Sequence, residues 1–341
     1  MSCFHPLHAL KSDGQVTLAG KPVYHVLKMT DPLWDSPDCV RLPCGKCVGC
    51  RLEYSRQWAN RCMLELGYHD SAYFVTLTYD DYHVPRSYYA DPSTGEAMPS
   101  LTLCKKDWQD FMKRLRYYFP NDRLRFYMCG EYGPQTQRPH MHAIIFGLHL
   151  TDLVPYAKSA QGYQYYTSES LQRAWSVRST IEDLFGQESV TPLAPIGYVV
   201  VGEVTWETCA YTARYIMKKL NGPEAKFYSD FNLEPPFVLM SRKPGIGRQY
   251  YDDHPDLYQY EYINISTPTG GRKFRPPRYF DKLYDIDHPE ELAQIKEIRR
   301  RQAEAAQAYK LQSSDLKDWQ LAELEERRLV DRISSLKRKE F

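Results

Sequence analysis

An α+β fold, with helices flanking a central antiparallel sheet, is the architecture that this sequence predicts. Strand-like segments rich in β-branched and aromatic residues occur at 72–79, 124–131, 140–147 and 197–204. Helical segments lie between some of them, whereas a Gly- and Pro-containing turn alone joins the second to the third. This order favours an antiparallel sheet over a parallel doubly wound one.

The expected elements of the first part of the chain alternate between helix and strand. A helix is expected over 53–66 and an alternating strand over 72–79. Pro, Gly and Ser are frequent over 81–100, which predicts a loop. The next helix, over 105–119, has one apolar side. That side consists of Trp108, Phe111, Met112 and Leu115.

The later elements lead to a long helix. A polar, tyrosine-rich insertion is expected over 151–166. A short helix over 168–177 follows, with Ser168 as its N-cap. The β-branched strand over 197–204 then leads to a helix that continues to Leu220, for which Thr205 is the candidate N-cap.

A His-Met-His sequence opens the third strand. Because side chains alternate along a strand, His140 and His142 project from one face, where two imidazoles are suited to bind a divalent metal ion. Glu131 ends the preceding strand, and an antiparallel hairpin would bring it toward both histidines. One carboxylate and two imidazoles leave coordination positions open, as a catalytic metal requires. In the alternative interpretation, both histidines are ordinary surface or core residues and Glu131 faces solvent.

Two tyrosines lie one turn apart on the long helix. Tyr211 and Tyr215 share a helix face, and Lys218 or Lys219 lies one turn further along. The alternative interpretation is a tyrosine pair that packs in the core beside solvated lysines. A phenol has a pKa near 10 and is a poor nucleophile by itself. A neighbouring cation or a metal-polarised phosphate would make its attack on phosphorus feasible.

These residues resemble a known family in three ordered motifs. The motifs are Phe-Val-Thr-Leu-Thr-Tyr-Asp-Asp at 74–81, Arg-Pro-His-Met-His at 138–142 and Tyr-Thr-Ala-Arg-Tyr-Ile-Met-Lys at 211–218. They are similar to the motifs of rolling-circle replication initiators, endonucleases with a His-hydrophobic-His (HUH) metal motif. The resemblance is greatest to the gokushovirus-type initiators of the Microviridae. It includes the stretches 43–51 and 1–6, and it covers about the first 220 residues.

The resemblance implies a metal site on the face of the sheet with the tyrosine helix alongside. It implies that Glu131, His140 and His142 hold Mg²⁺ or Mn²⁺ against the scissile phosphate of the replication origin. Tyr211 or Tyr215 would attack that phosphate, which leaves a 5′-phosphotyrosine and a free 3′-hydroxyl that primes synthesis.

The resemblance also implies how a replication round ends. The second tyrosine would cleave the regenerated origin, and the freed 3′-hydroxyl would attack the first covalent link to give a closed circle. Lys218 is the cation that matches the family pattern, with Lys219 as the alternative. The implied partners are single-stranded or supercoiled phage origin DNA and the host helicase, polymerase and single-strand binding protein.

A cysteine-rich block precedes the first helix. Cys44, Cys47 and Cys50 repeat the Cys-x-x-Cys spacing that aims two sulfurs at one metal ion. A tetrahedral structural zinc needs a fourth ligand, for which there are four candidates: Cys3, His5, Cys39 and Cys62. Cys3 is favoured because the resemblance includes it. The alternative is three reduced cysteines on a loop.

Composition limits the class of protein. The formal net charge is +1, so contact with DNA must depend on local basic clusters rather than on a global excess of positive charge. The candidate clusters are Lys105-Lys106, Lys113–Arg116, Arg123, Arg125, Arg242-Lys243, Arg248, Arg272-Lys273, Arg275 and Arg278. No run of eighteen apolar residues and no signal-peptide core is present. We therefore expect no membrane partner, a location in the cytoplasm of the bacterial host, and reduced cysteines.

Four regions are expected along the chain. They are a Cys-rich segment at 1–66, the endonuclease core at 67–225, a loop-rich accessory region at 226–288 and a charged helical tail at 289–341. The tail has three interpretations: a solvated helical hairpin, a partner-binding arm or an assembly element. Two other functions fit the residues, namely a metal-dependent nuclease in which water attacks, and a non-enzymatic zinc-stabilised DNA-binding regulator.

Overall fold

The computed structural model forms two compact units, Met1–Tyr54 with Asp281–Phe341, and Ser55–Phe280, which are described separately. The residues that the structure describes are 3–17, 20, 22–34, 36–133, 135–159, 162–178, 180–182, 188–215, 222–267 and 270–335.

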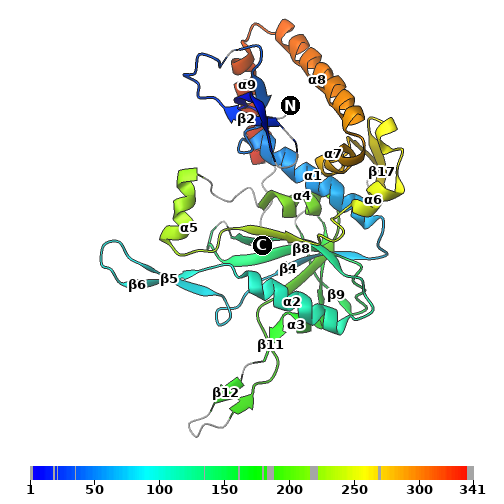
Figure 1. Ribbon diagram of the computed structural model, residues 1–341. Helices are drawn as coiled ribbons and strands as arrows, with labels where there is room; N and C mark the ends of the chain where they lie inside the picture. The colour runs from blue at the N-terminus through cyan, green and yellow to red at the C-terminus, as the bar shows by residue number, and fades with distance from the viewer. Residues whose placement is uncertain are drawn as a thin grey trace. The chain divides into compact units, whose positions relative to one another are not determined.

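A seven-stranded sheet is the centre of the unit Ser55–Phe280 (Figure 1). Its strands, in spatial order, are β16 (Phe237–Met240), β7 (Arg125–Tyr132), β8 (Pro139–Phe146), β4 (Ala72–Leu77), β15 (Val199–Glu203), β10 (Gln164–Ser168) and β9 (Leu153–Lys158). Every neighbouring pair is antiparallel. The α+β prediction is therefore confirmed, and the hairpin predicted between β7 and β8 is present.

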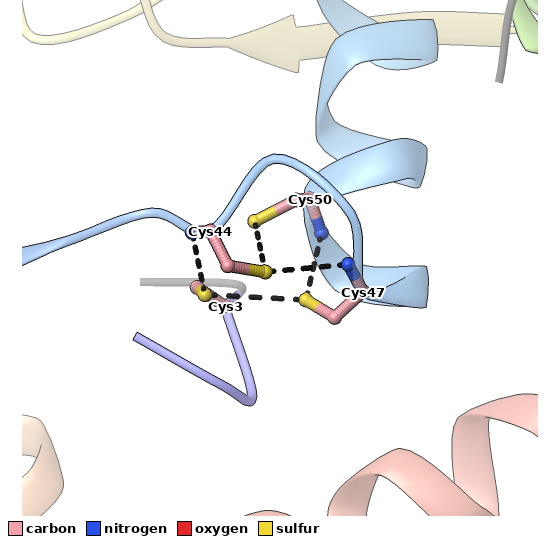
Figure 2. A group of neighbouring side chains, drawn as sticks. All are labelled: Cys3, Cys44, Cys47 and Cys50. Carbon is pink, nitrogen blue, oxygen red and sulfur yellow. Dashed lines mark hydrogen bonds between the residues drawn. The ribbon is translucent and has the colours of Figure 1, made fainter. Parts of the chain in front are cut away.

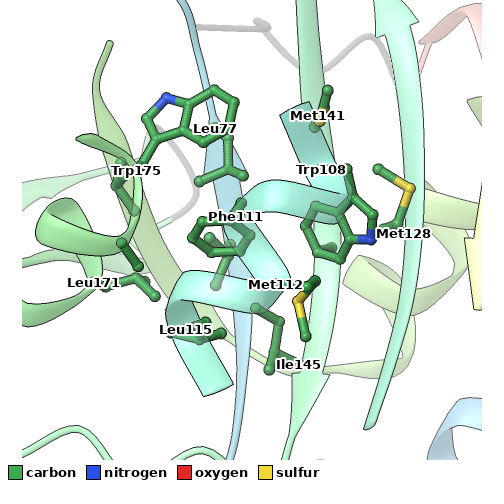
Figure 3. Packing of buried hydrophobic residues seen from close by; sticks show 14 of the residues in the cluster. Leu77, Trp108, Phe111, Met112, Leu115, Met128, Met141, Ile145, Leu171 and Trp175 are labelled. Carbon is green, nitrogen blue, oxygen red and sulfur yellow. The ribbon is translucent and has the colours of Figure 1, made fainter. Parts of the chain in front are cut away.

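One face of the sheet packs against α2 (Lys105–Tyr118) and α3 (Glu169–Ala174), as Figure 3 shows. The four α2 residues predicted to be apolar are all buried. They meet alternate strand residues such as Leu77, Met141 and Ile145. Burying a side chain of this size contributes about 1.5–3 kcal/mol. Ser168 is the N-cap of α3, as predicted, because its hydroxyl accepts a hydrogen bond from the backbone N–H of Leu171 at 3.1 Å.

The opposite face is covered by α1 (Val48–Leu66) and α4 (Trp206–Tyr215). Its strand residues, Phe74, Tyr127 and Ile144, are large. The α4 residues that meet them are small: Cys209, Ala210 and Ala213. Small side chains allow a helix to approach a sheet closely, so α4 lies against β7 and β8. This close approach determines where the tyrosine helix carries Tyr211.

Two sequence-based predictions of this unit were wrong. The expected loop over 81–100 contains a hairpin of β5 (Arg86–Ala90) and β6 (Ala97–Leu101). The expected insertion over 151–166 contains β9 and most of β10, which form one edge of the main sheet. Edge strands expose much of their surface, so their sequences carry polar residues in place of an alternating apolar pattern.

The segment that follows the tyrosine helix also contributes to the sheet. Strand β16 pairs with β7, so part of the region expected to be loop-rich extends the core. Its other elements are the 3₁₀ turns Gly222–Ala225 and Leu257–Gln259, α5 (Lys226–Asp230), α6 (Arg248–Asp253), and the hairpin β17 (Ile263–Thr267) with β18 (Gly270–Phe274). Between α3 and β15 lie the short pairs β11 (Ser176–Val177) with β14 (Ala194–Pro195) and β12 (Thr180–Glu182) with β13 (Glu188–Val190).

The second unit joins the two ends of the chain. It has a small sheet in the order β2 (Pro22–Val26), β1 (Leu7–Val16) and β3 (Val40–Leu42). Helix α7 (Arg278–Asp287) leads into it, followed by α8 (Pro289–Gln312) and α9 (Asp318–Ser335).

Helices α8 and α9 form the helical hairpin that was one interpretation of the charged tail. Lys310 of α8 pairs with Glu325 of α9 at 2.6 Å. Helix α9 is also tied to the N-terminal segment, because Glu326 bonds with His5 at 2.6 Å and Asp318 with Arg41 at 3.0 Å.

Candidate functional site

The β7–β8 hairpin brings Glu131, His140 and His142 together. Glu131 lies directly opposite His140 in the antiparallel register, and His142 follows two residues on, so all three share one face. Glu131 Oε1 is 2.8 Å from His140 Nε2 and 3.1 Å from His142 Nε2. One ligand atom from each residue lies within 4.8 Å of the other two, a spacing that one metal ion could bridge.

Both imidazoles are oriented by hydrogen bonds at their other ring nitrogen. His140 Nδ1 is 3.2 Å from the carbonyl oxygen of Arg138. His142 Nδ1 is 2.9 Å from the hydroxyl of Thr76, which pairs with His142 across β4 and β8. Because Nδ1 is engaged in each ring, Nε2 is the nitrogen that faces Glu131. Metal-binding histidines usually have this kind of second partner.

Glu131 is a carboxylate held inside the protein, with 2% of its surface exposed. Burial by itself would raise the pKa of this carboxyl group. Hydrogen bonds and charge interactions with His140 and His142 outweigh burial, so the pKa of Glu131 is lowered from its ordinary value. The ionised form is thereby favoured, which is the form that binds a cation.

Helix α4 places Tyr211 beside these residues. The Tyr211 ring packs edge-on against the His142 ring, with centroids 5.2 Å apart, and against Phe74 at 6.2 Å. Tyr211 is half-buried. Thr205 precedes the helix and its hydroxyl accepts a hydrogen bond from the N–H of Thr208 at 3.2 Å, so the predicted N-cap is confirmed.

The other predicted members of the tyrosine motif are not fully described. The backbone of Tyr215 ends α4, while its side chain lies outside the described residues. Lys218 and the alternative Lys219 lie outside the described residues altogether.

Thr76 and Arg138 join the first two motifs, and sequence reasoning assigned neither a role. The Arg138 guanidinium donates to the carbonyl oxygen of Tyr79 at 3.2 and 2.9 Å and to Asp81 Oδ1 at 2.7 Å. The start of β8 is thereby tied to the segment after β4. Their positions inside the motifs were the available signal, but neither contact follows from the spacing of residues along the chain.

Four cysteine side chains form a second cluster, shown in Figure 2. Cys44, Cys47 and Cys50 come from the loop and first turn of α1, and Cys3 comes from the N-terminal segment. The sulfurs of Cys3 and Cys47 are 3.9 Å apart, and those of Cys44 and Cys50 are 4.0 Å apart. The structure thus brings together the four cysteines predicted to share one metal ion.

Backbone N–H groups surround these sulfurs. The N–H of Phe4 lies 3.4 Å from Cys47 Sγ and that of Cys50 lies 3.5 Å from it. Burial would raise the pKa of the Cys47 thiol, but these donors and the neighbouring thiols lower it from 9.0 to about 7. Burial raises the pKa of Cys3 and of Cys50. Cys47 is therefore the thiol of these three that ionises most readily, and the thiolate is the form that binds metals.

Several of the candidate basic residues are engaged in ion pairs. Arg125 pairs with the buried Glu65, and Arg248 pairs with Asp252 at 2.7 Å. Carboxylates also pair with Lys105, Lys106, Lys113, Arg272 and Arg275. Their positive charge is partly neutralised, so these clusters are weaker sites for DNA phosphates than the sequence indicates. In the described part of the chain, no helix is both long and apolar enough to cross a membrane.

An antiparallel sheet that carries a His-Met-His strand, with a two-tyrosine helix on the same face, is the arrangement expected of a phage replication-associated protein. Comparison with known proteins agrees. The family model for replication-associated proteins of the ORF2 type matches residues 72–220. This range contains the sheet strands β4 to β15 and the tyrosine helix.

Individual relatives extend this similarity. "Replication-associated protein ORF2" of Spiroplasma virus 4 is 33% identical over 269 residues, which are 77% of this chain and 74% of that protein. "Replication-associated protein VP4" of Bdellovibrio phage phiMH2K is 28% identical over 299 residues, 85% of this chain and 79% of that protein. "Replication-associated protein ORF4" of Chlamydia phage 1 is 27% identical over 181 residues, 52% of this chain and 38% of that protein. No solved structure is significantly similar.

This chain therefore belongs to the replication-associated protein family of the Microviridae. The family resemblance expected from the three motifs is confirmed.

Proposed function

We propose that this protein initiates phage DNA replication by cutting one DNA strand at the origin, with a tyrosine as nucleophile and a divalent metal ion as cofactor. The observation that carries the proposal is the position of Tyr211, whose ring lies against His142 at 5.2 Å. A candidate nucleophile and a candidate metal ligand are thus in direct contact. Membership of the replication-associated family supports a role in phage DNA replication.

The side chains of Glu131, His140 and His142 fit a divalent ion. They offer one carboxylate oxygen and two Nε2 atoms within 4.8 Å of one another, and both rings are oriented from behind. An ion bound there would polarise the scissile phosphate and stabilise charge that develops on it. Carboxylates suit Mg²⁺ and Mn²⁺, whereas imidazole favours a transition metal, so we infer that Mn²⁺ binds more tightly than Mg²⁺.

In the chemical step, the Tyr211 hydroxyl oxygen forms a bond to phosphorus and the bond from phosphorus to the 3′ oxygen breaks. The phenol loses its proton to solvent, and the departing 3′ oxygen takes up a proton to become a 3′-hydroxyl. The products are a 5′-phosphotyrosine and a primer end for the host polymerase. No electron is gained or lost.

Tyr215 is proposed as the second nucleophile. It lies four residues after Tyr211, so the helix presents both on one face. It would cleave the regenerated origin after one round, and the freed 3′-hydroxyl would attack the first phosphotyrosine to close a circle. Lys218, or alternatively Lys219, would supply positive charge next to the reacting phosphate.

The cysteine cluster is proposed to hold a structural zinc ion. Zinc–sulfur bonds of about 2.3 Å in a tetrahedron require sulfurs about 3.8 Å apart. The Cys3–Cys47 and Cys44–Cys50 separations of 3.9 and 4.0 Å fit that requirement. Such an ion would fix the N-terminal segment to the start of α1, because Cys3 and Cys50 belong to these two parts.

A labelled-DNA assay tests the nicking proposal. Full-length protein and Mn²⁺ are mixed with single-stranded fragments that together cover the phage genome, labelled at the 3′ end. We expect one fragment to place its label on the protein in a denaturing gel. The same fragment labelled at the 5′ end is expected to yield a shortened DNA that a polymerase extends. His140→Ala is expected to abolish both products, while His149→Ala, an exposed histidine paired with Asp122, is the matched control.

The same assay separates the other two functions. Cleavage without label on the protein would establish a nuclease in which water attacks. Binding without cleavage, unchanged by His140→Ala, would establish a non-enzymatic regulator. Pull-down of the host helicase, polymerase and single-strand binding protein by the covalent complex tests the proposed partners.

A further inference from the structure

Tyr198 lies in the same row of the sheet as two of the candidate metal ligands. Strand β4 pairs Leu77 with Met141 of β8 on one side and with Val199 of β15 on the other. Continuing both registers by one residue places Thr78 opposite His140 and Tyr198 opposite Thr78. Residues directly opposite in antiparallel strands point to the same face. Tyr198 therefore belongs to the metal-site face, two strands away from His140.

The backbone that carries Tyr198 is firmly held. Thr78 N–H and the Thr78 hydroxyl both donate to the carbonyl oxygen of Tyr198, at 3.0 and 3.2 Å, and Tyr198 N–H donates to the same hydroxyl at 3.0 Å. Gln172 bonds with the residues on either side, at 2.9 Å to the carbonyl oxygen of Gly197 and 3.2 Å from the N–H of Val199. The side chain of Gln172 thus bridges the two neighbours of Tyr198.

Gly197 adds a steric constraint. A Cβ atom at this position would overlap the carbonyl oxygen of Thr78, so only glycine permits the approach of the two backbones. Five hydrogen bonds and this close approach leave the backbone at Tyr198 little freedom to move.

The Tyr198 ring itself is 77% exposed. Its neighbour Val199 points to the other face and is buried in the core. A ring that is so exposed contributes little to packing, yet its backbone is more constrained than an ordinary loop requires. A fixed, exposed aromatic ring is a surface on which an unpaired base can stack.

We propose that Tyr198 stacks against a base of the single-stranded DNA next to the scissile phosphate. The inference rests on the proposed nicking function for the meaning of that phosphate. Two strand spacings of about 4.8 Å place the backbone of Tyr198 about 10 Å from that of His140. Stacked nucleotides advance about 3.4 Å each along a strand, so the stacked base lies within about three nucleotides of the scissile bond.

Stacking positions the strand without reading its sequence, because every base has a flat aromatic face. Tyr198 is accordingly a positioning residue, whereas sequence recognition belongs to other contacts. Its effect is expected on the binding of substrate, so a variant would raise KM and leave kcat nearly unchanged.

The test uses oligothymidylate as the probe, so that it does not depend on nicking. Fluorescence anisotropy measures binding of a labelled dT oligonucleotide to the full-length protein and to three variants. We expect Tyr198→Ala to weaken binding about tenfold, which is about 1.4 kcal/mol, and Tyr198→Phe to bind as the natural protein does. Tyr117→Ala is the matched control, because Tyr117 is 79% exposed on α2, the helix that covers the opposite face.

A blunt DNA duplex of the same length gives the second readout. Paired bases cannot stack on a side chain, so Tyr198→Ala is expected to leave duplex binding unchanged. Equal loss with single strand and duplex, or no loss with either, overturns the inference.

The labelled-DNA assay with the natural protein keeps this inference separate from the proposed function. Normal adduct formation together with unchanged dT binding by Tyr198→Ala rejects stacking alone. A selective tenfold loss of single-strand binding without any adduct supports stacking and rejects the nicking proposal.

Discussion

The Nδ1 atom of His142 lies 2.9 Å from the hydroxyl oxygen of Thr76, directly across the pairing of β8 with β4. A hydrogen bond from Nδ1–H to this oxygen leaves the lone pair on Nε2, which faces Glu131 Oε1 at 3.1 Å. Thr76 therefore orients a candidate metal ligand from behind.

Replacing Thr76 tests this orientation. Thr76→Val keeps the shape of the side chain but removes the hydroxyl, and we expect the affinity for Mn²⁺ to fall about 10- to 100-fold. Thr76→Ser restores the hydroxyl and is expected to bind Mn²⁺ nearly as tightly as the natural protein. Calorimetric titration measures both. Equal affinities for the valine and serine variants would show that the hydrogen bond has no role in metal binding.

Substitution of each tyrosine by phenylalanine tests the two proposed nucleophiles. Tyr211→Phe keeps the ring against His142 but lacks the attacking oxygen, so the first cleavage is expected to fall by several orders of magnitude. Tyr215→Phe is expected to form the first adduct and to release no closed circles. Gel analysis of adducts and circles measures both steps. Normal circle release by Tyr215→Phe would contradict alternation, and an adduct mapped to Tyr215 in Tyr211→Phe would reverse the order.

Metal dependence tests the mixed set of ligands. Because two of the three ligands are imidazoles, we expect Mn²⁺ to support adduct formation at a lower concentration than Mg²⁺ does. Removal of divalent ions with a chelator is expected to stop the reaction, and added Mn²⁺ is expected to restore it. Half-maximal concentrations of the two ions give the comparison. A lower half-maximal concentration for Mg²⁺ would indicate that oxygen ligands dominate the site.

Zinc content tests the cysteine cluster. The natural protein is expected to contain a single zinc ion, and Cys47→Ser to contain close to none, because a thiolate ligand is lost. Cys39→Ser is the matched control, since Cys39 lies in the same unit but outside the cluster. Elemental analysis by plasma mass spectrometry measures the zinc. If Cys39→Ser lost as much zinc as Cys47→Ser, the assignment of ligands would be wrong.

The buried Glu65 gives an expected dependence of stability on pH. Burial raises the pKa of this carboxyl group, but His69, the N–H of Gly247 and Arg125 outweigh burial and lower it below 4.5. A group whose pKa is lowered by folding stabilises the folded state above its unfolded pKa. This stabilisation is lost as the pH falls from about 4.5 through the lower folded value.

Replacement of Glu65 by glutamine checks this expectation. Glu65→Gln leaves the Arg125 charge without its partner in the pair and is expected to lower the free energy of unfolding by about 3 kcal/mol at pH 7. The difference from the natural protein should shrink as the pH falls below 4. Urea unfolding at pH 7 and at pH 3.5 measures it, with the exposed Glu203→Gln as control. A difference that is the same at both pH values would refute the proposed linkage.

The sequence by itself was sufficient for features that depend on local periodicity. His140 and His142 point to one face because side chains alternate along any strand. The apolar side of α2 and the N-cap at Ser168 also follow from residues a few positions apart. The ordered motifs were sufficient to indicate the family. The edge strands β9 and β10 and the β5–β6 hairpin were missed, since exposed strands carry no alternating apolar pattern.

Only the tertiary structure decided which distant residues meet. The register of β7 on β8 puts Glu131 opposite His140, and the register of β4 on β8 puts Thr76 beside His142. The small residues of α4 allow it to lie close enough for Tyr211 to touch His142. Among the four candidates for the last cysteine-cluster ligand, folding of the N-terminal segment selects Cys3. Contacts of this kind depend on packing between remote segments, which local patterns of polarity and spacing do not encode.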